Sequence, residues 1–181
     1  MPTIVAIPGS LRRGSFNAAL LRAAAELAPQ GCRVEIESIR GIPVYDGDVE
    51  AQGIPEAVVL LKQRIVAGDA LLLATPEYNN SLPGPLKNAI DWLSRPTADI
   101  ARVFKDRAVG LIGATPGPGG TRMSQTAWLP VLRTLGTRPW FGKTIFLGNA
   151  AQAFDEAGRL VDDKLRGLVR EYMAGFASFL G

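Results

Sequence analysis

The sequence predicts an α/β fold in which helices cover both faces of a parallel sheet. Three observations predict it: short continuous apolar runs, amphipathic stretches that alternate with them, and glycine or proline at their boundaries. Apolar residues make up 47% of the 181 residues and charged residues 20%, which is typical of a globular protein. We expect a single domain spanning residues 1–181, because neither a repeat nor a linker divides the chain.

Five segments have the pattern of strands, and most are too continuously apolar to face water on either side. They are residues 3–8, 32–36, 70–74, 108–112 and 143–147. Five segments with apolar residues every three or four positions are predicted as helices. They are residues 16–27, 56–67, 86–93, 121–135 and 162–180. Pro130 should kink or divide the fourth helix, because it lacks the backbone N–H that an interior helical residue donates.

Composition excludes several classes of function. The chain has no histidine and one cysteine, which excludes Ser–His–Asp triads, Cys–His pairs, histidine metal sites and internal disulfides. The net charge of +3 is spread without a basic run, so we expect no nucleic-acid partner. No apolar run is long enough to span a membrane and no basic leader precedes the first strand, so we expect a cytoplasmic protein. Any enzymatic chemistry must come from a cofactor or from carboxylates.

Ligands of open parallel sheets bind beyond the carboxyl ends of the strands, so the loops after the first, third and fourth strands are the candidates. The first loop, residues 9–15, contains two hydroxyls, two arginines and two glycines, and opens directly into a helix. The unpaired N–H groups and positive end of a helix suit one phosphate. The alternative, which the residues alone leave open, is that Ser15 is an ordinary helix cap and the arginines face solvent.

The second and third loops also have unusual compositions. Residues 75–85 combine three prolines, a tyrosine and two asparagines, which suits the edge and face of a planar heterocycle. The alternative is a rigid turn capped by Ser81. Residues 113–120 contain four glycines, which permit close approach of the backbone to a ligand or, alternatively, serve as a hinge.

Four segments together resemble one family. They are GSLRRGSFN, TPEYNNSLPGPLKNAIDWLSRP, GGTR and FDEAGRLVDD, and they cover nearly the whole chain in order. This combination is similar to the NADPH-dependent FMN reductases, which include quinone, azo-dye and chromate reductases. The resemblance implies a flavodoxin-like, five-stranded sheet in the order 2-1-3-4-5 with bound FMN. It also implies electron transfer from NADPH or NADH to a small oxidant such as a quinone, and assembly as a homodimer or homotetramer.

The resemblance further implies the site residues, none of which is catalytic because the flavin is the redox centre. Around the FMN phosphate and ribityl chain it places Ser10, Arg12, Ser15, Phe16 and Asn17. Along the isoalloxazine, mainly through backbone groups, it places Pro76, Glu77, Tyr78, Asn79, Asn80 and Ser81. On the other side it places Ala114 and Thr115. The chain departs from the family pattern in its proline-rich third loop and in Pro130.

Two alternatives to an enzyme remain at this point. A flavodoxin-type carrier would shuttle single electrons between proteins, but such carriers are strongly acidic and this chain is not. A regulatory role would bind FMN or NADPH without turnover.

Two further expectations concern assembly. The third and fourth helices carry large apolar residues that either serve a subunit interface or pack into the core: Ile90, Trp92, Leu93, Met123, Trp128 and Leu129. Glu77 and Arg122 should face one cleft. We favour an ion pair between them across a subunit boundary. Alternatively, Arg122 binds the dinucleotide phosphates. The third possibility is an exposed ion pair that contributes little to stability.

Overall fold

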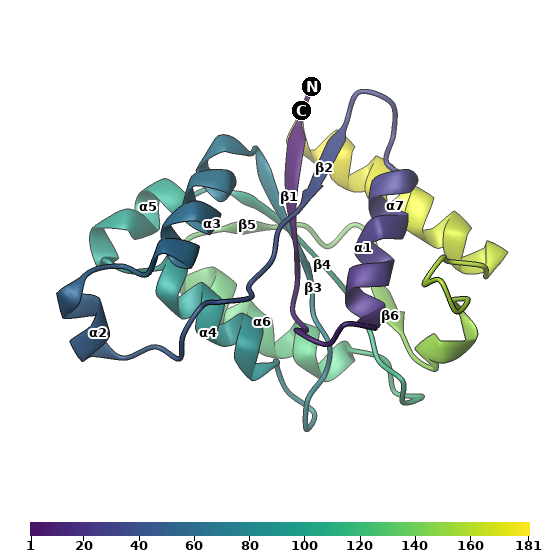
Figure 1. The fold of residues 1–181 in the computed structure, drawn as a ribbon. Helices are drawn as coiled ribbons and strands as arrows, with labels where there is room; N and C mark the ends of the chain where they lie inside the picture. Colours follow the sequence, from purple (N-terminus) through teal and green to yellow (C-terminus); the bar gives the residue numbers. More distant parts are fainter.

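The computed structural model describes residues 1–181 and has one parallel sheet with helices on both faces (Figure 1). The strand order is β2-β1-β3-β4-β5, with β6 also paired to β4, which confirms the expected order. The strands are β1 Thr3–Pro8, β2 Arg33–Ile36, β3 Ala70–Ala74, β4 Ala108–Ala114, β5 Arg138–Pro139 and β6 Ile145–Leu147. Both chain ends lie at the edge of the sheet opposite the loops after β1, β3 and β4 (Figure 1).

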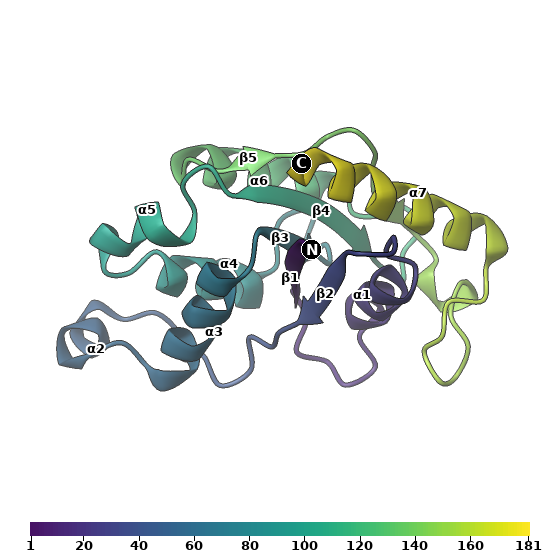
Figure 2. The same ribbon diagram turned by 90° about the horizontal axis from the view of Figure 1, so that it is seen from above.

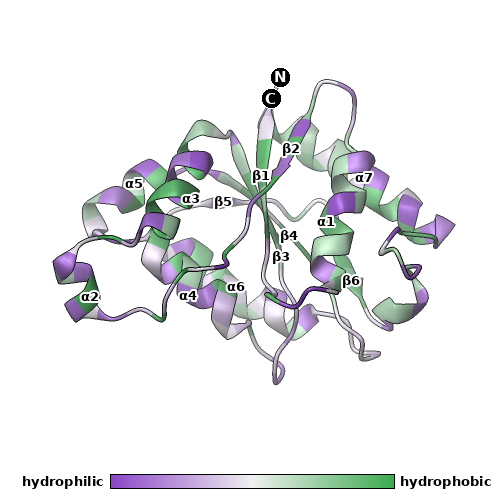
Figure 3. Cartoon of the chain, viewed as in Figure 1, coloured by the Kyte–Doolittle hydropathy of each residue, from purple (hydrophilic) through white to green (hydrophobic).

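Successive side chains of each central strand enter two different cores, one on each face of the sheet. In β1, Ile4 and Ala6 pack on one face, whereas Val5 and Ile7 pack on the other. This burial on both faces explains why β1, β3 and β4 are largely apolar runs, mostly green in Figure 3.

The first core is covered by α1 Phe16–Glu26 and α7 Asp163–Leu180, and the second by α3 Glu56–Ala67, α4 Gly84–Leu93, α5 Ile100–Val103 and α6 Arg122–Thr134. Figure 2 shows α1 and α7 on one side of the central strands and α3 and α4 on the other. Each of the five predicted helices is present, with bounds that differ by two residues or fewer. The apolar stripe of each helix faces the sheet and its polar side faces water (Figure 3).

The expected fifth strand is divided, which corrects the prediction of a strand over residues 143–147. β5 pairs with Ala108 and Val109, while β6 pairs with Ile112 to Ala114, and the edge of β4 between them is left unpaired by strands. The hydroxyl of Tyr172 donates to the Leu111 carbonyl at 3.1 Å, which is the acceptor that a continuous edge strand would use. Trp140 packs edge-on against the Tyr172 ring, with centroids 4.8 Å apart, in the segment between β5 and β6.

Short helices in three connections were not predicted. The segment between β2 and α3 contains α2 Gly47–Gln52, which buries no residue and is defined by the Asp46 cap. The segment after α4 contains the 3₁₀ helix η1 Thr97–Asp99 and then α5, and η2 Ala150–Gln152 follows β6. These elements are too short to show an amphipathic period.

Pro130 neither divides α6 nor ends it, so of the two expected outcomes, a kink or a division, the division is wrong. The helix runs from Arg122 to Thr134 with Pro130 inside it. Trp128 and Leu132 on either side of the proline are buried in the second core. Tertiary packing therefore holds the helix through the missing hydrogen bond.

Candidate functional site

Three loops meet at the carboxyl edge of the sheet: loop one after β1 (residues 9–15), loop two after β3 (residues 75–83) and loop three after β4 (residues 115–121). A side chain on Gly9 would bring its Cβ within 2.9 Å of Pro76 and of Leu86, so loop one closes directly onto loop two. A Cβ on Gly113 would come within 2.3 Å of Thr75 and of Thr121, so loop two closes equally tightly onto loop three. The three loops lie together along this edge, at the bottom of Figure 1.

Loop one presents unpaired donors at the start of α1. The Ser15 hydroxyl accepts from the Ala18 N–H at 3.2 Å and is the N-cap, so the helix-cap interpretation of Ser15 is confirmed. The next two N–H groups, of Phe16 and Asn17, have no acceptor within the chain. The Arg12 guanidinium lies over the Phe16 ring, 5.6 Å from its centroid. A helix start with free donors and a cation is an anion-binding arrangement.

Two expected site residues from different loops contact each other directly. The Asn17 carboxamide donates to the Ala114 carbonyl at 2.8 Å and accepts from the Ala114 N–H at 3.0 Å. Asn17 and Ala114 are 3% and 1% exposed, so neither presents its side chain at the surface. Both polar atoms of the Asn17 side chain are thus used inside the protein, where they tie α1 to the end of β4.

Loop two forms a tight hairpin. Tyr78 and Ser81 exchange backbone hydrogen bonds at 3.1 and 3.0 Å, and Asn79 and Asn80 between them have φ of 50° and 58°. Positive φ at both central residues gives a two-residue hairpin turn, and asparagine tolerates this conformation best after glycine. Residues 78–81 are exposed at the tip that projects farthest from the sheet (Figure 1), whereas Pro76 is buried. Ser81 closes the hairpin through its backbone pairing with Tyr78, so the rigid turn of the alternative is present, and Pro83 is the N-cap of α4 without a side-chain bond.

Glu77 anchors this hairpin to α6. Its Oε2 accepts from the N–H groups of Met123 at 2.9 Å and Ser124 at 3.1 Å. The side chain of the N-cap residue Thr121 accepts no capping bond from the first turn, so Glu77 supplies the cap and places its charge at the positive helix end. Arg122 instead lies over the Phe146 ring, 4.8 Å from its centroid. An exposed Glu77–Arg122 pair within one chain is therefore wrong.

A buried hydroxyl cluster beneath loop two was not foreseen. Thr75 Oγ1 lies 2.7 Å from Ser124 Oγ and accepts from Trp128 Nε1 at 3.0 Å. Thr75, Ser124 and Trp128 are fully buried. Thr75 is the first residue of loop two and Ser124 lies in the first turn of α6. The cluster therefore holds the start of the loop against α6, and Glu77 holds the hairpin against the same helix.

Loop three is held by its own chain. The Thr115 N–H donates to the Leu147 carbonyl at 2.9 Å, and the Thr115 carbonyl accepts from Ala150 at 3.1 Å. Gly120 has a φ of 69°, and a Cβ there would lie 2.5 Å from the Phe146 carbonyl. At Gly113 and Gly120 the absence of a side chain leaves space for other residues of the same chain, namely Thr75 and Thr121 beside Gly113 and Phe146 beside Gly120.

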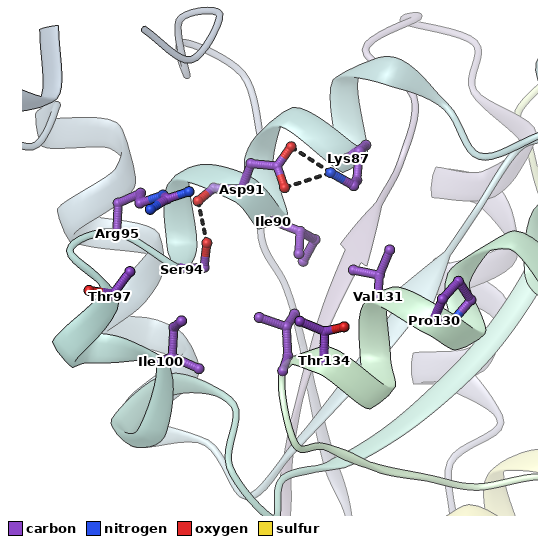
Figure 4. A pocket seen from close by; sticks show the side chains of 11 residues that line it. Lys87, Ile90, Asp91, Ser94, Arg95, Thr97, Ile100, Pro130, Val131 and Thr134 are labelled. Atoms are coloured by element: carbon purple, nitrogen blue, oxygen red, sulfur yellow. Dashed lines mark hydrogen bonds and ion pairs between the residues drawn. The ribbon is translucent and has the colours of Figure 1, made fainter. Parts of the chain in front are cut away.

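Two cavities lie near this edge or beside it. A polar cavity of about 270 Å³ adjoins loop one at Arg13 and Ser15 and is closed by the turn at residues 154–158. A larger one, of about 400 Å³, lies between α4 and α6 (Figure 4). Its rim carries the Lys87–Asp91 ion pair at 2.7 Å, and none of its lining residues belongs to the three loops. No cluster of three or more metal-ligating side chains is present, and no helix is long and apolar enough to cross a membrane.

A parallel sheet in this order, with an anion-binding helix start after β1, defines a flavodoxin-like protein, whose FMN site lies at the β1/β3 edge. Residues 2–152 match the model of the NADPH-dependent FMN reductase family. The chain belongs to this family. It is therefore an oxidoreductase that uses FMN and NAD(P)H, and the family does not favour a flavodoxin-type electron carrier.

Individual relatives agree with this assignment. The chain is 43% identical over 170 residues to an NAD(P)H-dependent FMN reductase of Pseudomonas aeruginosa, covering 94% of this chain and 90% of that protein. It is 37% identical over 178 residues to a quinone reductase of Pseudomonas putida, covering 98% and 94%. The solved structure of FerB, a flavoenzyme NAD(P)H:acceptor oxidoreductase from Paracoccus denitrificans, superposes with a TM-score of 0.88 at 32% identity, covering 99% of this chain and 97% of that one.

Proposed function

We propose that the enzyme holds FMN on the three loops and passes two electrons from NAD(P)H to a quinone or a similar small oxidant. The family supplies the cofactor and the electron donor. Relatives named quinone reductase support the choice of acceptor. The structural observation that carries the proposal is the pair of acceptor-free N–H groups at the start of α1.

The phosphate of FMN would bind at loop one. Ser10, Arg12 and Ser15, with the backbone N–H groups of Phe16 and Asn17, would surround it. The Ser15 hydroxyl accepts from Ala18 but keeps its own proton to donate. Charge-assisted bonds from Arg12 and the helix start would neutralise the phosphate.

The ring would lie against loops two and three, bordered by residues 76–81 and by Ala114 and Thr115. The Glu77 bonds to α6 and the Asn17 bonds to Ala114 support this arrangement, because they hold these loops in fixed positions. We assign Glu77 and the Asn17 side chain as positioning residues; the hairpin backbone would face the ring.

When bound, FMN supplies the hydride and electron chemistry that this histidine-free chain cannot supply by itself. The protein contributes binding, orientation and exclusion of water. The exposed hairpin tip at residues 78–81 leaves an approach for the dinucleotide and then the acceptor.

The test is anaerobic turnover of the FMN-loaded protein with NADPH and methylbenzoquinone. The account predicts one quinone reduced per NADPH oxidised. Reduction of the flavin only by single electrons from a partner protein, with no NADPH oxidation, would support the carrier alternative instead.

We further propose that the protein is a homodimer or homotetramer. Ile90, Trp92, Leu93 and Trp128 pack into the core, which removes most of the apolar surface that suggested an interface. Met123 and Leu129 on α6 are 55% and 40% exposed, and the cavity beside α4 and α6 has apolar walls, which together still support one (Figure 4). Light scattering that gave a 19.3 kDa monomer at micromolar concentration would overturn this proposal.

We also propose a cytoplasmic location, because the reaction consumes reduced dinucleotide from the metabolic pool. Cell fractionation tests it directly: activity recovered outside the cytoplasmic fraction would contradict it.

A further inference from the structure

An apolar groove of about 440 Å³ runs along the outer side of loop one. It is lined by Leu11, Ile39, Ile42, Val44, Gly84, Pro85 and Asn88. No charged side chain lines it, although the chain as a whole is one-fifth charged. Its volume lies within the range of small-molecule sites.

The polar groups in the groove wall are already paired. Asn88 Oδ1 accepts from the Tyr45 N–H at 2.8 Å, and Asn88 Nδ2 donates to the Pro43 carbonyl at 2.8 Å. Trp92 Nε1 donates to the same carbonyl at 2.9 Å, so α4 holds the Pro43–Tyr45 segment at two points. These bonds leave the groove wall apolar and also fix its shape.

The opposite wall is fixed in the same way. Arg40 donates to the Leu11 carbonyl at 2.6 Å, which ties loop one to the segment after β2. Two apolar side chains on these fixed walls stand in water: Val44 is 84% exposed and Leu11 is 40% exposed. Exposed apolar groups beside a preformed groove indicate a surface that binds something apolar.

The groove adjoins the proposed cofactor site on two sides. Leu11 stands between Ser10 and Arg12 of the phosphate loop, and Gly84 and Pro85 follow the hairpin of loop two. A molecule seated over the ring could therefore extend a substituent into the groove. The substituent would be a hydrocarbon, because no charged side chain lines the groove and its one polar side chain, Asn88, is already bonded.

We propose that this groove binds the alkyl or prenyl side chain of the electron acceptor, so that the enzyme prefers tailed quinones to bare ones. The inference rests on the proposed quinone reductase function. It assigns a specificity subsite to Leu11, Ile42, Val44 and Gly84.

The test uses benzoquinones that carry a methyl, butyl or decyl group, because lengthening the alkyl chain hardly changes the ring chemistry. Gly84→Leu fills the groove: nothing lies within 4 Å of where a Cβ would stand, and the residue opens α4 without a positive φ. Val44→Asp places a charge on the groove wall. Val161→Asp is the matched control, since Val161 is also exposed, at 54%, and lies outside the groove.

Each methylene that leaves water contributes about 0.8 kcal/mol, a factor of about four. We therefore expect kcat/KM of the wild-type holoenzyme to rise about tenfold or more from the methyl to the butyl quinone. In Gly84→Leu and Val44→Asp, kcat/KM for the butyl quinone should be no more than about twice kcat/KM for the methyl quinone. In Val161→Asp it should match the wild type.

Equal kcat/KM for methyl and butyl quinones in the wild type would overturn the inference while leaving quinone reduction intact. If both groove variants keep the wild-type ratio of butyl to methyl kcat/KM, the inference is also overturned. The same holds if Val44→Asp changes the oligomeric state but keeps the dependence of kcat/KM on chain length. If no quinone is reduced, the proposed function fails separately. Calorimetric titration of the oxidised holoprotein then tests the groove without turnover: tighter binding of the butyl quinone, lost in Gly84→Leu, supports it, and equal binding overturns it.

Discussion

The Asn17 carboxamide forms a two-way hydrogen bond with the backbone of Ala114, donating at 2.8 Å and accepting at 3.0 Å. The two residues are 97 positions apart in sequence, and the pair joins the first turn of α1 to the end of β4. One buried side chain thus sets the spacing between the proposed phosphate loop and the loop on the far side of the ring.

Asn17→Ala should destabilise the FMN-free protein. It leaves the buried N–H and carbonyl of Ala114 without partners, so the free energy of unfolding should fall by about 2–4 kcal/mol. Denaturant unfolding measures this, with the exposed Gln63→Ala as the control. If the FMN-free protein keeps its stability and only FMN affinity falls, the Asn17 side chain contacts the cofactor instead.

Arg12→Ala should weaken FMN binding by about 1.5–3 kcal/mol, the range for a hydrogen bond to a charged group, with little change in folding. Fluorescence titration of FMN into the apoprotein provides the measurement, and Arg13→Ala on the same loop is the control. If Arg12→Ala binds FMN as tightly as the wild type does, the Arg12 side chain faces solvent and does not bind the phosphate.

Ser15→Ala is expected to behave differently from Arg12→Ala, because Ser15 caps α1. Loss of the cap should lower the free energy of unfolding of the FMN-free protein by about 1 kcal/mol, in addition to any loss of FMN affinity. Thermal unfolding of the apoprotein checks this; an unchanged midpoint would show that the cap bond is not stabilising.

Glu77→Ala should remove the acceptor for two N–H groups of α6 and lower the free energy of unfolding by about 1 kcal/mol. Turnover should fall as well, because the hairpin loses its attachment. Glu77→Gln keeps an acceptor oxygen and should recover most of both properties, and the exposed Glu156→Ala serves as the control. Wild-type unfolding with abolished flavin binding in Glu77→Ala would instead place the carboxylate on the flavin.

Arg122→Ala tests the two roles that the sequence left open. Since the Glu77 carboxylate caps α6, we predict the dinucleotide role: KM for NADPH should rise by roughly tenfold, the loss expected for a charge-assisted bond, while the oligomer stays intact. Steady-state kinetics and light scattering are run together, with Arg133→Ala on the same helix as the control. Dissociation followed by FMN loss would favour the interface role.

The sequence predicted the layers and the edge that carries the site from apolar periodicity and loop composition, and the strand order from the family resemblance. Residues 70–74 and 56–67 match the observed bounds of β3 and α3. Periodicity failed at the sheet edge, where the decisive contact is the Tyr172 hydroxyl on the Leu111 carbonyl, 61 residues away. No local pattern contains that information.

The same limit applies within the site. The family resemblance marked Glu77, Asn17 and Ser15 as candidates, but their partners on α6, on β4 and within α1 decide what each does. The sequence did not predict the cluster of Thr75, Ser124 and Trp128. A threonine after a strand and a serine in a first helical turn are common, and only the fold brings them and the Trp128 Nε1 together.

The most direct test of the central claim is the absorbance spectrum of the purified protein before and after anaerobic NADPH. The account predicts flavin bands that bleach with NADPH and return when methylbenzoquinone is added. It also predicts that heat releases FMN, because loop one offers one phosphate site and no second. Release of FAD, or a protein that takes up no flavin when mixed with FMN, would contradict the account.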